Sequence, residues 1–253
     1  MGKNKWISFS NNREDAKLNL LCFPYAGGSP SFFAQWKRIM PEEINMCPVL
    51  YPFREVRRSE QMPDTIQELA KDFVDNNEEL FQKPFAVFGH CAGGTIGYEV
   101  CVEARKKYGV EPVYFVASGE EPPEYSLEAF QYLEDASNEE MLDYLIEHHF
   151  AEESIRTNKG FLDYYLPIIR VDFNMLYHYH MTVCEKFNCP IYVITGEGDQ
   201  VIEKERLDNW NKYTNGKVSY MTFPGDHYYL AHEAQALCNL MKDFYEESVE
   251  ISE

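Results

Sequence analysis

Cys91 lies at the centre of the sequence Gly89-His90-Cys91-Ala92-Gly93, in which glycines stand two positions before and after the cysteine. The same spacing occurs in G-x-S-x-G turns, where a nucleophile lies on a strained turn between a strand and a helix. A helix after the cysteine would favour a thiolate, and later an oxyanion, through its amino-terminal dipole and free N–H groups. The spacing therefore predicts that Cys91 is a nucleophile, and a small buried residue is the alternative interpretation.

A nucleophile of this kind needs a base and a carboxylate that orients the base, and two loops supply candidates. The sequence "ITGEGDQVI" places Asp199 just after a predicted strand, and "FPGDHYYL" places His227 just after the next one. Acid and then histidine is the chain order that accompanies a G-x-S-x-G turn. We therefore predict that His227 is the general base and that Asp199 is the orienting carboxylate. The rival acids are Asp226 and Glu197, and the rival histidines are His90, His232, His148, His149, His178 and His180.

Negative charge that develops on a substrate oxygen needs two N–H donors, and a glycine-rich loop after an early strand offers the second one. In "CFPYAGGSPSFF" a predicted strand ends at Phe23, and the two glycines that follow let the backbone approach a ligand. We predict that the N–H of Ala92 acts together with the N–H of Tyr25 or Ala26. A plain glycine turn is the alternative interpretation.

Short apolar runs alternate with helical patterns and predict the elements that would carry these residues. Runs that are buried on both faces are typical of parallel sheets. One helix is predicted at 64–81, where Asp64 can cap the first turn, and another at 95–108. Strand, helix, strand in this order implies an α/β fold with a mainly parallel central sheet flanked by helices. The predicted strands are 18–23, 47–51, 85–89, 113–118, 190–199 and 217–223, and further helices are predicted near 202–214 and at 229–247.

A helical insertion is predicted between residues 120 and 185, because no strand-like run occurs there. Ser137 and Glu140 form a capping box at the start of one helical pattern, and a second pattern at 160–181 contains Pro167. The segment is rich in Tyr, Phe, Leu and Met, so part of its apolar surface is expected to face a ligand cavity, with core packing as the alternative. The predicted organisation is a core of residues 1–119 and 186–253 with an insertion of residues 120–185.

The composition indicates one acidic globular domain and excludes several classes of function. The 253 residues carry a net charge of −19, which repels nucleic acid and anionic lipid. The first residues lack the apolar core of a signal peptide, no stretch is long enough to span a membrane, and seven cysteines without CxxC spacing suggest free thiols. We therefore expect a cytoplasmic monomer without a metal site or a nucleotide-binding loop. Arg54, Arg57 and Arg58 in "FREVRR" form either a local basic patch for an anionic ligand or an ordinary solvated loop.

Taken together, the motifs resemble the type II thioesterases of nonribosomal peptide and polyketide synthases, which belong to the α/β-hydrolase superfamily. The resemblance rests on "FPYAGGS", "YPFREVRR", "GHCAGG", "LPIIRVDF", "TGEGD" and "FPGDHYYL", in this order between about residues 18 and 245. It implies a helical lid, a Ser-His-Asp triad, and hydrolysis of acyl groups carried as phosphopantetheine thioesters on carrier proteins. No cofactor is implied beyond the phosphopantetheine arm, which arrives with the substrate. The resemblance also implies that Arg54, Arg57 and Arg58 meet the acidic carrier protein or its phosphate arm.

The sequence departs from this family at Cys91, where the family pattern has serine. Three explanations remain open: a natural cysteine enzyme that still hydrolyses, a natural variant with altered chemistry, or a serine enzyme whose nucleophile has been replaced. An acyl-cysteine is itself a thioester and reacts with amines and thiols as well as water, so an acyltransferase or an amide- or ring-forming enzyme is the alternative function. A catalytically silent binding protein would need a broken triad, and Asp199 and His227 are both present.

Overall fold

A parallel sheet runs through the protein and places the carboxyl ends of its strands along one edge. The computed structural model describes residues 4–11, 13, 15–125, 133 and 135–252. Within these residues the sheet has six strands in the order β2-β1-β3-β4-β5-β6, and every neighbouring pair is parallel. The predicted mainly parallel α/β fold is therefore confirmed. The strands are β1 (Leu18–Phe23), β2 (Ile44–Pro48), β3 (Phe85–His90), β4 (Phe115–Ser118), β5 (Ile191–Gly196) and β6 (Val218–Phe223).

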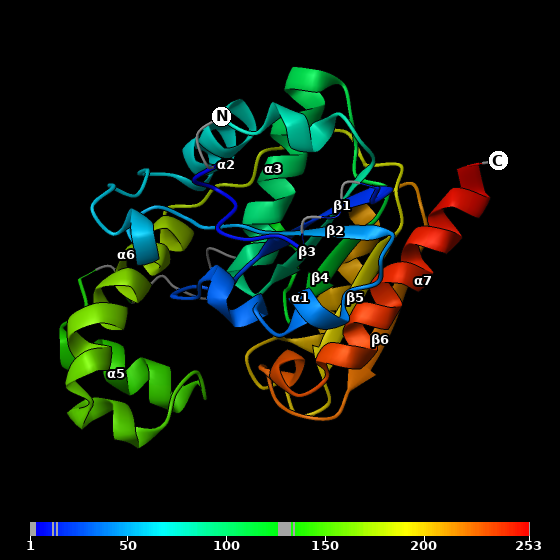
Figure 1. Ribbon diagram of the computed structural model, residues 1–253. Coiled ribbons are helices and arrows are strands. Elements are labelled where there is room, and N and C mark those ends of the chain that lie inside the picture. The colour runs from blue at the N-terminus through cyan, green and yellow to red at the C-terminus, as the bar shows by residue number, and fades with distance from the viewer. Residues whose placement is uncertain (1–3, 12, 14, 126–132, 134, 253) are drawn as a thin grey trace.

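Helices cover both faces of this sheet, as Figure 1 shows. Helices α2 (Ile66–Asp75) and α3 (Ala92–Tyr108) lie on one face, and α1 (Trp36–Ile39) and α7 (Ala234–Ser252) lie on the other. Each face of the sheet packs against its helices in a separate apolar cluster. Alternate residues of β1 belong to the two clusters, because successive side chains of a strand point to opposite faces. Leu21 packs with the residues of α2 and α3, whereas Leu20 packs with those of α1 and α7. Burial on both faces explains why the strands are continuous apolar runs.

Several element boundaries differ from the sequence-based expectation. Thr65, not Asp64, caps α2, since its side-chain oxygen accepts the backbone N–H of Glu68. Strand β2 begins three residues earlier than predicted, at Ile44, and α7 begins later than predicted, at Ala234. The helix expected near 202–214 is a 3₁₀ helix at Lys204–Lys212. These differences move the ends of elements and leave the order of the elements unchanged.

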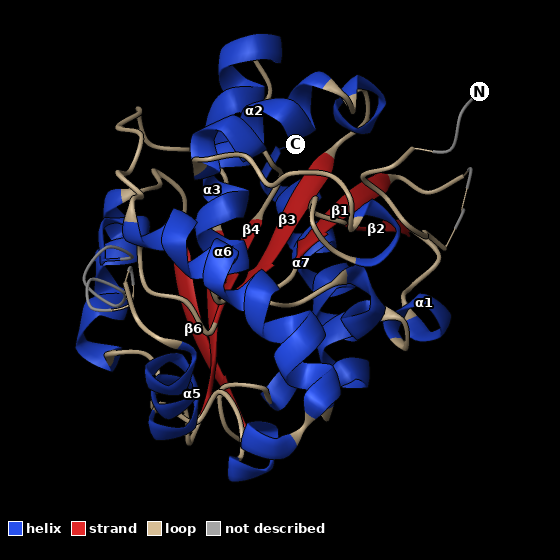
Figure 2. Ribbon diagram, turned by 90° about the vertical axis from the view of Figure 1, so that its left-hand side faces the viewer, coloured by secondary structure: helices blue, strands red, loops and turns tan. Residues whose placement is uncertain are grey.

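The segment 120–185, which we call the insertion, connects β4 to β5 and carries helices but no strand within its described residues; residues 126–132 and 134 lie outside them. It contains α5 (Asn138–Glu147), whose predicted capping box is present, and α6 (Leu166–Tyr177), which follows a π-helical turn at Phe161–Tyr165. Pro167 lies at the start of α6, directly after the π-helical turn. Figure 2 shows α6 in front of the sheet, with α5 beside it. Among the described helices, none combines the length and the apolar character that crossing a membrane requires.

Candidate active site

Cys91 forms the turn between β3 and α3 in a conformation that cysteine rarely adopts. Its φ is 50° and its ψ is −131°, and its N–H donates to the carbonyl of Ser118 at 2.9 Å. A Cβ on Gly89 would collide with the carbonyl oxygen of Gly93, and a Cβ on Gly93 would collide with the carbonyl oxygen of Phe23. The flanking glycines are therefore required because helix and strand pack backbone against backbone. Strain of this kind costs about 1–3 kcal/mol and persists only where the surrounding structure enforces it.

His227 and Asp199 lie on neighbouring loops after β6 and β5 and contact each other directly. Nδ1 of His227 lies 2.9 Å from Oδ2 of Asp199, and both residues are buried. The other carboxylate oxygen, Oδ1, accepts the backbone N–H of Val201 at 2.9 Å. The rival acids Asp226 and Glu197 are both exposed. Asp199, and neither rival acid, is thus the carboxylate in hydrogen-bond contact with the imidazole.

The thiol of Cys91 lies at the same edge of the sheet without a hydrogen bond to the imidazole. Nε2 of His227 is buried and has no hydrogen-bond partner among the described residues, so it is free to accept a proton. Burial raises the pKa of Cys91 above its ordinary value, and the carboxyl groups of Glu120 and Asp199 raise it further. The resting side chain is therefore a neutral thiol, and its attack on a substrate requires a base.

Two backbone N–H groups act electrostatically on the Cys91 thiol. They belong to Ala92, at the start of α3, and to Ala26, in the loop after β1, and both lower the pKa of the thiol. In that loop the N–H of Gly28 closes a turn onto the carbonyl of Tyr25 at 2.8 Å. Of the two donors that the sequence offered in this loop, the geometry favours Ala26 over Tyr25. Two donors that converge from separate elements form the arrangement that stabilises an oxyanion.

Two further ionisable residues lie near the site: His90, which the sequence offered only as a rival base, and Glu120, which was not among the predicted site residues. His90 is fully buried, its Nδ1 bonds to Ser118, and its ring centre lies 4.8 Å from that of His227. Burial lowers the pKa of His90 well below its ordinary value, and the neighbouring imidazole adds to this, so His90 stays neutral. Glu120 follows β4, and burial raises the pKa of its carboxyl group well above the usual range. The position of Glu120 directly after a predicted strand was the sequence signal that could have identified it.

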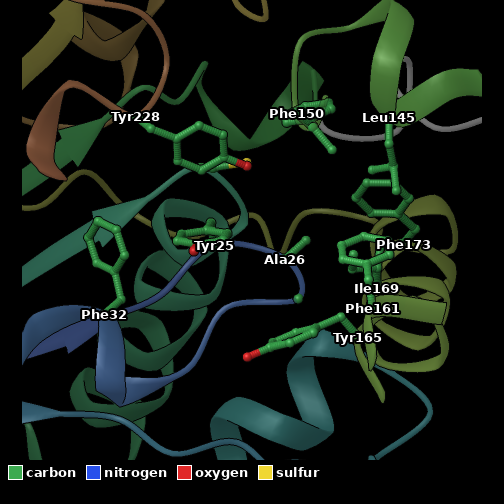
Figure 3. Close-up of a pocket in the computed structure, with 13 residues that line it drawn as sticks. Tyr25, Ala26, Phe32, Leu145, Phe150, Phe161, Tyr165, Ile169, Phe173 and Tyr228 are labelled. Carbon is green, nitrogen blue, oxygen red and sulfur yellow. The ribbon is translucent and has the colours of Figure 1, made fainter. Parts of the chain in front are cut away.

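A cavity of about 440 Å³ opens above Cys91. Figure 3 shows side chains of the core facing side chains of the insertion across it, with aromatic rings on both sides. No charged side chain lines this cavity in the described part of the chain, so it suits an apolar group. The core contributes Tyr25, Ala26, Gly27, Phe32, Cys91 and Tyr228, and the insertion contributes Leu145, Phe150, Ala151, Phe161, Tyr165, Ile169 and Phe173.

The predicted basic patch is not a surface patch, and its assignment needs correction. Arg54 and Arg57 are only 1% and 2% exposed. Arg54 pairs with Asp172, whereas Arg57 stacks on an aromatic ring and bonds to the carbonyl of Leu50. Both guanidinium groups are therefore used inside the protein and are not available to a carrier protein. Arg58 is half-buried, and its guanidinium lies against an aromatic ring and a backbone carbonyl.

Comparisons with known proteins agree with this geometry. A family model described as the thioesterase domain matches residues 18–245. GrsT, a gramicidin S biosynthesis protein of Aneurinibacillus migulanus, is 30% identical over 238 residues, which cover 94% of this chain and 93% of that protein. The structure of RedJ, a thioesterase from the prodiginine biosynthetic pathway in Streptomyces coelicolor, matches with a TM-score of 0.81 at 26% identity and covers 90% of this chain and 88% of that chain. The type II thioesterase BorB, from the borrelidin biosynthetic cluster, matches with a TM-score of 0.81 at 25% identity over 94% of this chain and 97% of that chain.

These matches confirm the resemblance that the sequence motifs indicated, since they span nearly the whole chain and most of each relative. They also agree with the observed sheet, because the matching structures include the insertion and the core together. The chain belongs to the thioesterase family, with an α/β-hydrolase fold, and is a hydrolase that acts on thioester bonds.

Proposed function

We propose that this thioesterase releases acyl groups from phosphopantetheine-bearing carrier proteins of a nonribosomal peptide or polyketide synthase through an acyl-Cys91 intermediate. One observation carries the proposal: Cys91 lines an apolar cavity. The N–H groups of Ala26 and Ala92 support it, because both lower the pKa of the thiol. The relatives support the substrate class, since the matching structures include a type II thioesterase from the borrelidin biosynthetic cluster. A cytoplasmic location and a monomeric state remain predictions.

In the acylation step, Nε2 of His227 accepts the thiol proton as Cys91 Sγ attacks the carbonyl carbon of the thioester. The carbonyl oxygen becomes an oxyanion and accepts hydrogen bonds from Ala26 and Ala92. Collapse of this intermediate breaks the bond to the pantetheine sulfur, which takes the proton from the imidazolium. The buried carboxylate of Asp199 stabilises that imidazolium through Nδ1, 2.9 Å away.

In the second step, His227 deprotonates a water molecule, which attacks the acyl-Cys91 carbonyl carbon. The same two N–H groups stabilise the second oxyanion, and collapse releases the free acid and the Cys91 sulfur, which regains its proton from His227. Because burial raises the pKa of the thiol, its attack in the first step needs a base that accepts the proton. His227 Nε2 therefore acts as the base in both steps, on the thiol in acylation and on water in deacylation.

The cavity indicates which acyl groups fit. Its lining is mostly aromatic and aliphatic, and the described lining residues include no partner for a charged acyl group. Burying an unpaired charge there would be costly, so we expect apolar acyl chains to be preferred. The acyl chain would lie between Tyr228 on the core side and Phe150 on the insertion side (Figure 3).

Transfer of the acyl group to an amine is the second candidate, and the identity of Cys91 favours it. A serine would trap the acyl group as an oxygen ester, whereas acyl-Cys91 keeps the reactivity of a thioester. Hydrolysis and transfer share the first step and differ only in what attacks next.

Incubation with an apolar acyl carrier protein, with and without a small primary amine, tests both candidates. Intact mass of the enzyme should show an acyl adduct that is absent from Cys91→Ala, and the product should be the free acid. If an amide were the main product, the enzyme would be an acyltransferase and not a hydrolase under these conditions. Turnover by Cys91→Ala at the parental rate would exclude the acyl-cysteine mechanism.

A further inference from the structure

A buried ion pair holds the loop that carries the oxyanion donor Ala26. Asp172, on α6 of the insertion, accepts the N–H of Gly27 at 2.7 Å through Oδ2. Arg54 binds both carboxylate oxygens of Asp172, at 2.9 and 2.6 Å, and its Nη1 also donates to the carbonyl of Gly28 at 2.9 Å. The exposed fractions of Arg54 and Asp172 are 1% and 4%. The pair therefore binds two consecutive residues of the loop, Gly27 and Gly28.

The two hydrogen bonds act next to the donor. The N–H of Gly27 belongs to the peptide unit that directly follows Ala26, so an acceptor fixed on it restricts how the Ala26 N–H can turn. Gly27 has a φ of 77°, in the left-handed region. Glycine has no side chain that would restrict its backbone to this conformation. Without contacts from other segments of the chain, the loop could adopt several conformations. Arg54 and Asp172 supply contacts that select one of them.

The same helix face also forms a wall of the cavity. Ile169, Asp172 and Phe173 follow the i, i+3, i+4 spacing that puts side chains on one face of α6. Ile169 and Phe173 line the cavity, and Ile169 packs so closely on Gly27 that a Cβ there would collide with it. The position of α6 thus decides both the shape of the cavity and the presence of an acceptor for the Gly27 N–H.

We propose that Arg54 and Asp172 are positioning residues of the oxyanion hole, and that they make its formation depend on α6 being seated over the cavity. The inference rests on the proposed acyl-Cys91 mechanism and extends it. When α6 is in place, Asp172 holds the N–H of Gly27, next to Ala26, whose own N–H lowers the pKa of the Cys91 thiol. When α6 moves away, the carboxylate moves with it and the loop loses its constraint.

The test separates a reaction that forms an oxyanion from one that does not. Acylation of Cys91 by an apolar acyl-N-acetylcysteamine thioester passes through an oxyanion, whereas alkylation of the same sulfur by iodoacetamide is a direct displacement without one. Both rates are measured by mass spectrometry on Asp172→Asn and Arg54→Lys, with peptide mapping to isolate Cys91. A general loosening of the fold would instead raise the alkylation rate, because it would expose the buried Cys91.

Arg57→Lys is the matched control. Arg57 is as buried as Arg54 and also bonds to a backbone carbonyl and to a carboxylate, that of Glu60, but it does not contact the loop at 25–28. Loss of one oxyanion donor costs about 10²- to 10³-fold, so a displaced donor should slow acylation by about 10- to 100-fold. We expect this loss in Asp172→Asn and Arg54→Lys, with a much smaller loss of alkylation, because a displaced Ala26 N–H no longer lowers the pKa of the thiol; neither change is expected in Arg57→Lys.

Three outcomes would overturn the inference: parental acylation in both variants, equal losses of acylation and alkylation, or the same selective loss in Arg57→Lys. If the proposed function itself were wrong, the experiment would give a different result. In that case the parent itself would form no acyl adduct, although iodoacetamide would still alkylate Cys91.

Discussion

Replacement of Asp199 by asparagine should disable the enzyme by reversing the tautomer of His227. Asp199 uses its oxygens for two partners: Oδ1 accepts the N–H of Val201, and Oδ2 faces Nδ1 of His227, each at 2.9 Å. Since the backbone N–H can only donate, an asparagine must keep its amide oxygen there and turn its NH₂ group toward the imidazole. His227 would then accept on Nδ1 and carry its proton on Nε2, the atom that must receive the thiol proton.

The size of the effect follows from two losses. The imidazolium loses a charge-assisted hydrogen bond, worth about 1.5–3 kcal/mol, and recovery of the active tautomer leaves two buried donors facing each other, at about 1–3 kcal/mol. Together these amount to about 2.5–6 kcal/mol, which corresponds to a roughly 10²- to 10⁴-fold slower acylation of Cys91. Single-turnover acylation, followed by intact mass, measures this step directly.

Asp226→Asn and Glu197→Gln are the controls for this prediction. Both side chains are exposed acids in the same two loops, and Asp226 bonds only to the nearby N–H of Tyr228 among the described hydrogen bonds. Neither variant should slow acylation by more than about threefold, a change of under 1 kcal/mol. The reasoning fails if Asp199→Asn loses less than about tenfold, or if Asp226→Asn loses as much.

Three further changes have defined outcomes. Cys91→Ser should accumulate an oxygen ester and give less amide relative to acid when an amine is present, as product analysis would show; an unchanged ratio would contradict this. Glu120→Gln should move the pH profile of Cys91 alkylation to lower pH, because the Glu120 charge raises the pKa of the thiol, and a shift to higher pH would reverse that sign. Gly27→Ala should lower the free energy of unfolding by about 2–5 kcal/mol, through its φ of 77° and a collision with Ile169. Thermal melts should then show a Tm lower by about 4–20 °C, and an unchanged Tm would mean that the loop adapts without cost.

The sequence predicts the order of the strands and the loops that follow them, because both signals are local. Apolar runs reveal buried strands, and the glycines around Cys91 reveal a turn in which backbone meets backbone. The positions of Asp199 and His227 after their strands follow from the same signals, and the structure brings these two residues into contact. Their catalytic roles, and that of Cys91, remain predictions.

What the sequence does not predict depends on distant partners. Arg54 and Asp172 are 118 residues apart in the chain, so nothing near "FREVRR" indicates that the guanidinium is buried against a helix of the insertion. The choice of Ala26 over Tyr25 depends on the exact path of the loop that this pair holds. Glu120 likewise becomes relevant only when β4 is placed between β3 and β5.

The two walls of the cavity should tolerate amino-acid substitutions to different degrees. The core wall includes the loops that carry the reacting groups, so substitutions there would disturb bond making, whereas α5 and α6 carry none of the reacting groups. Phe173 is thus a place where selectivity can diverge without loss of the chemistry. Its neighbours on α6 that contact the loop at Gly27 are the exception, and directed evolution of this enzyme toward new acyl groups should leave Asp172 and Ile169 untouched.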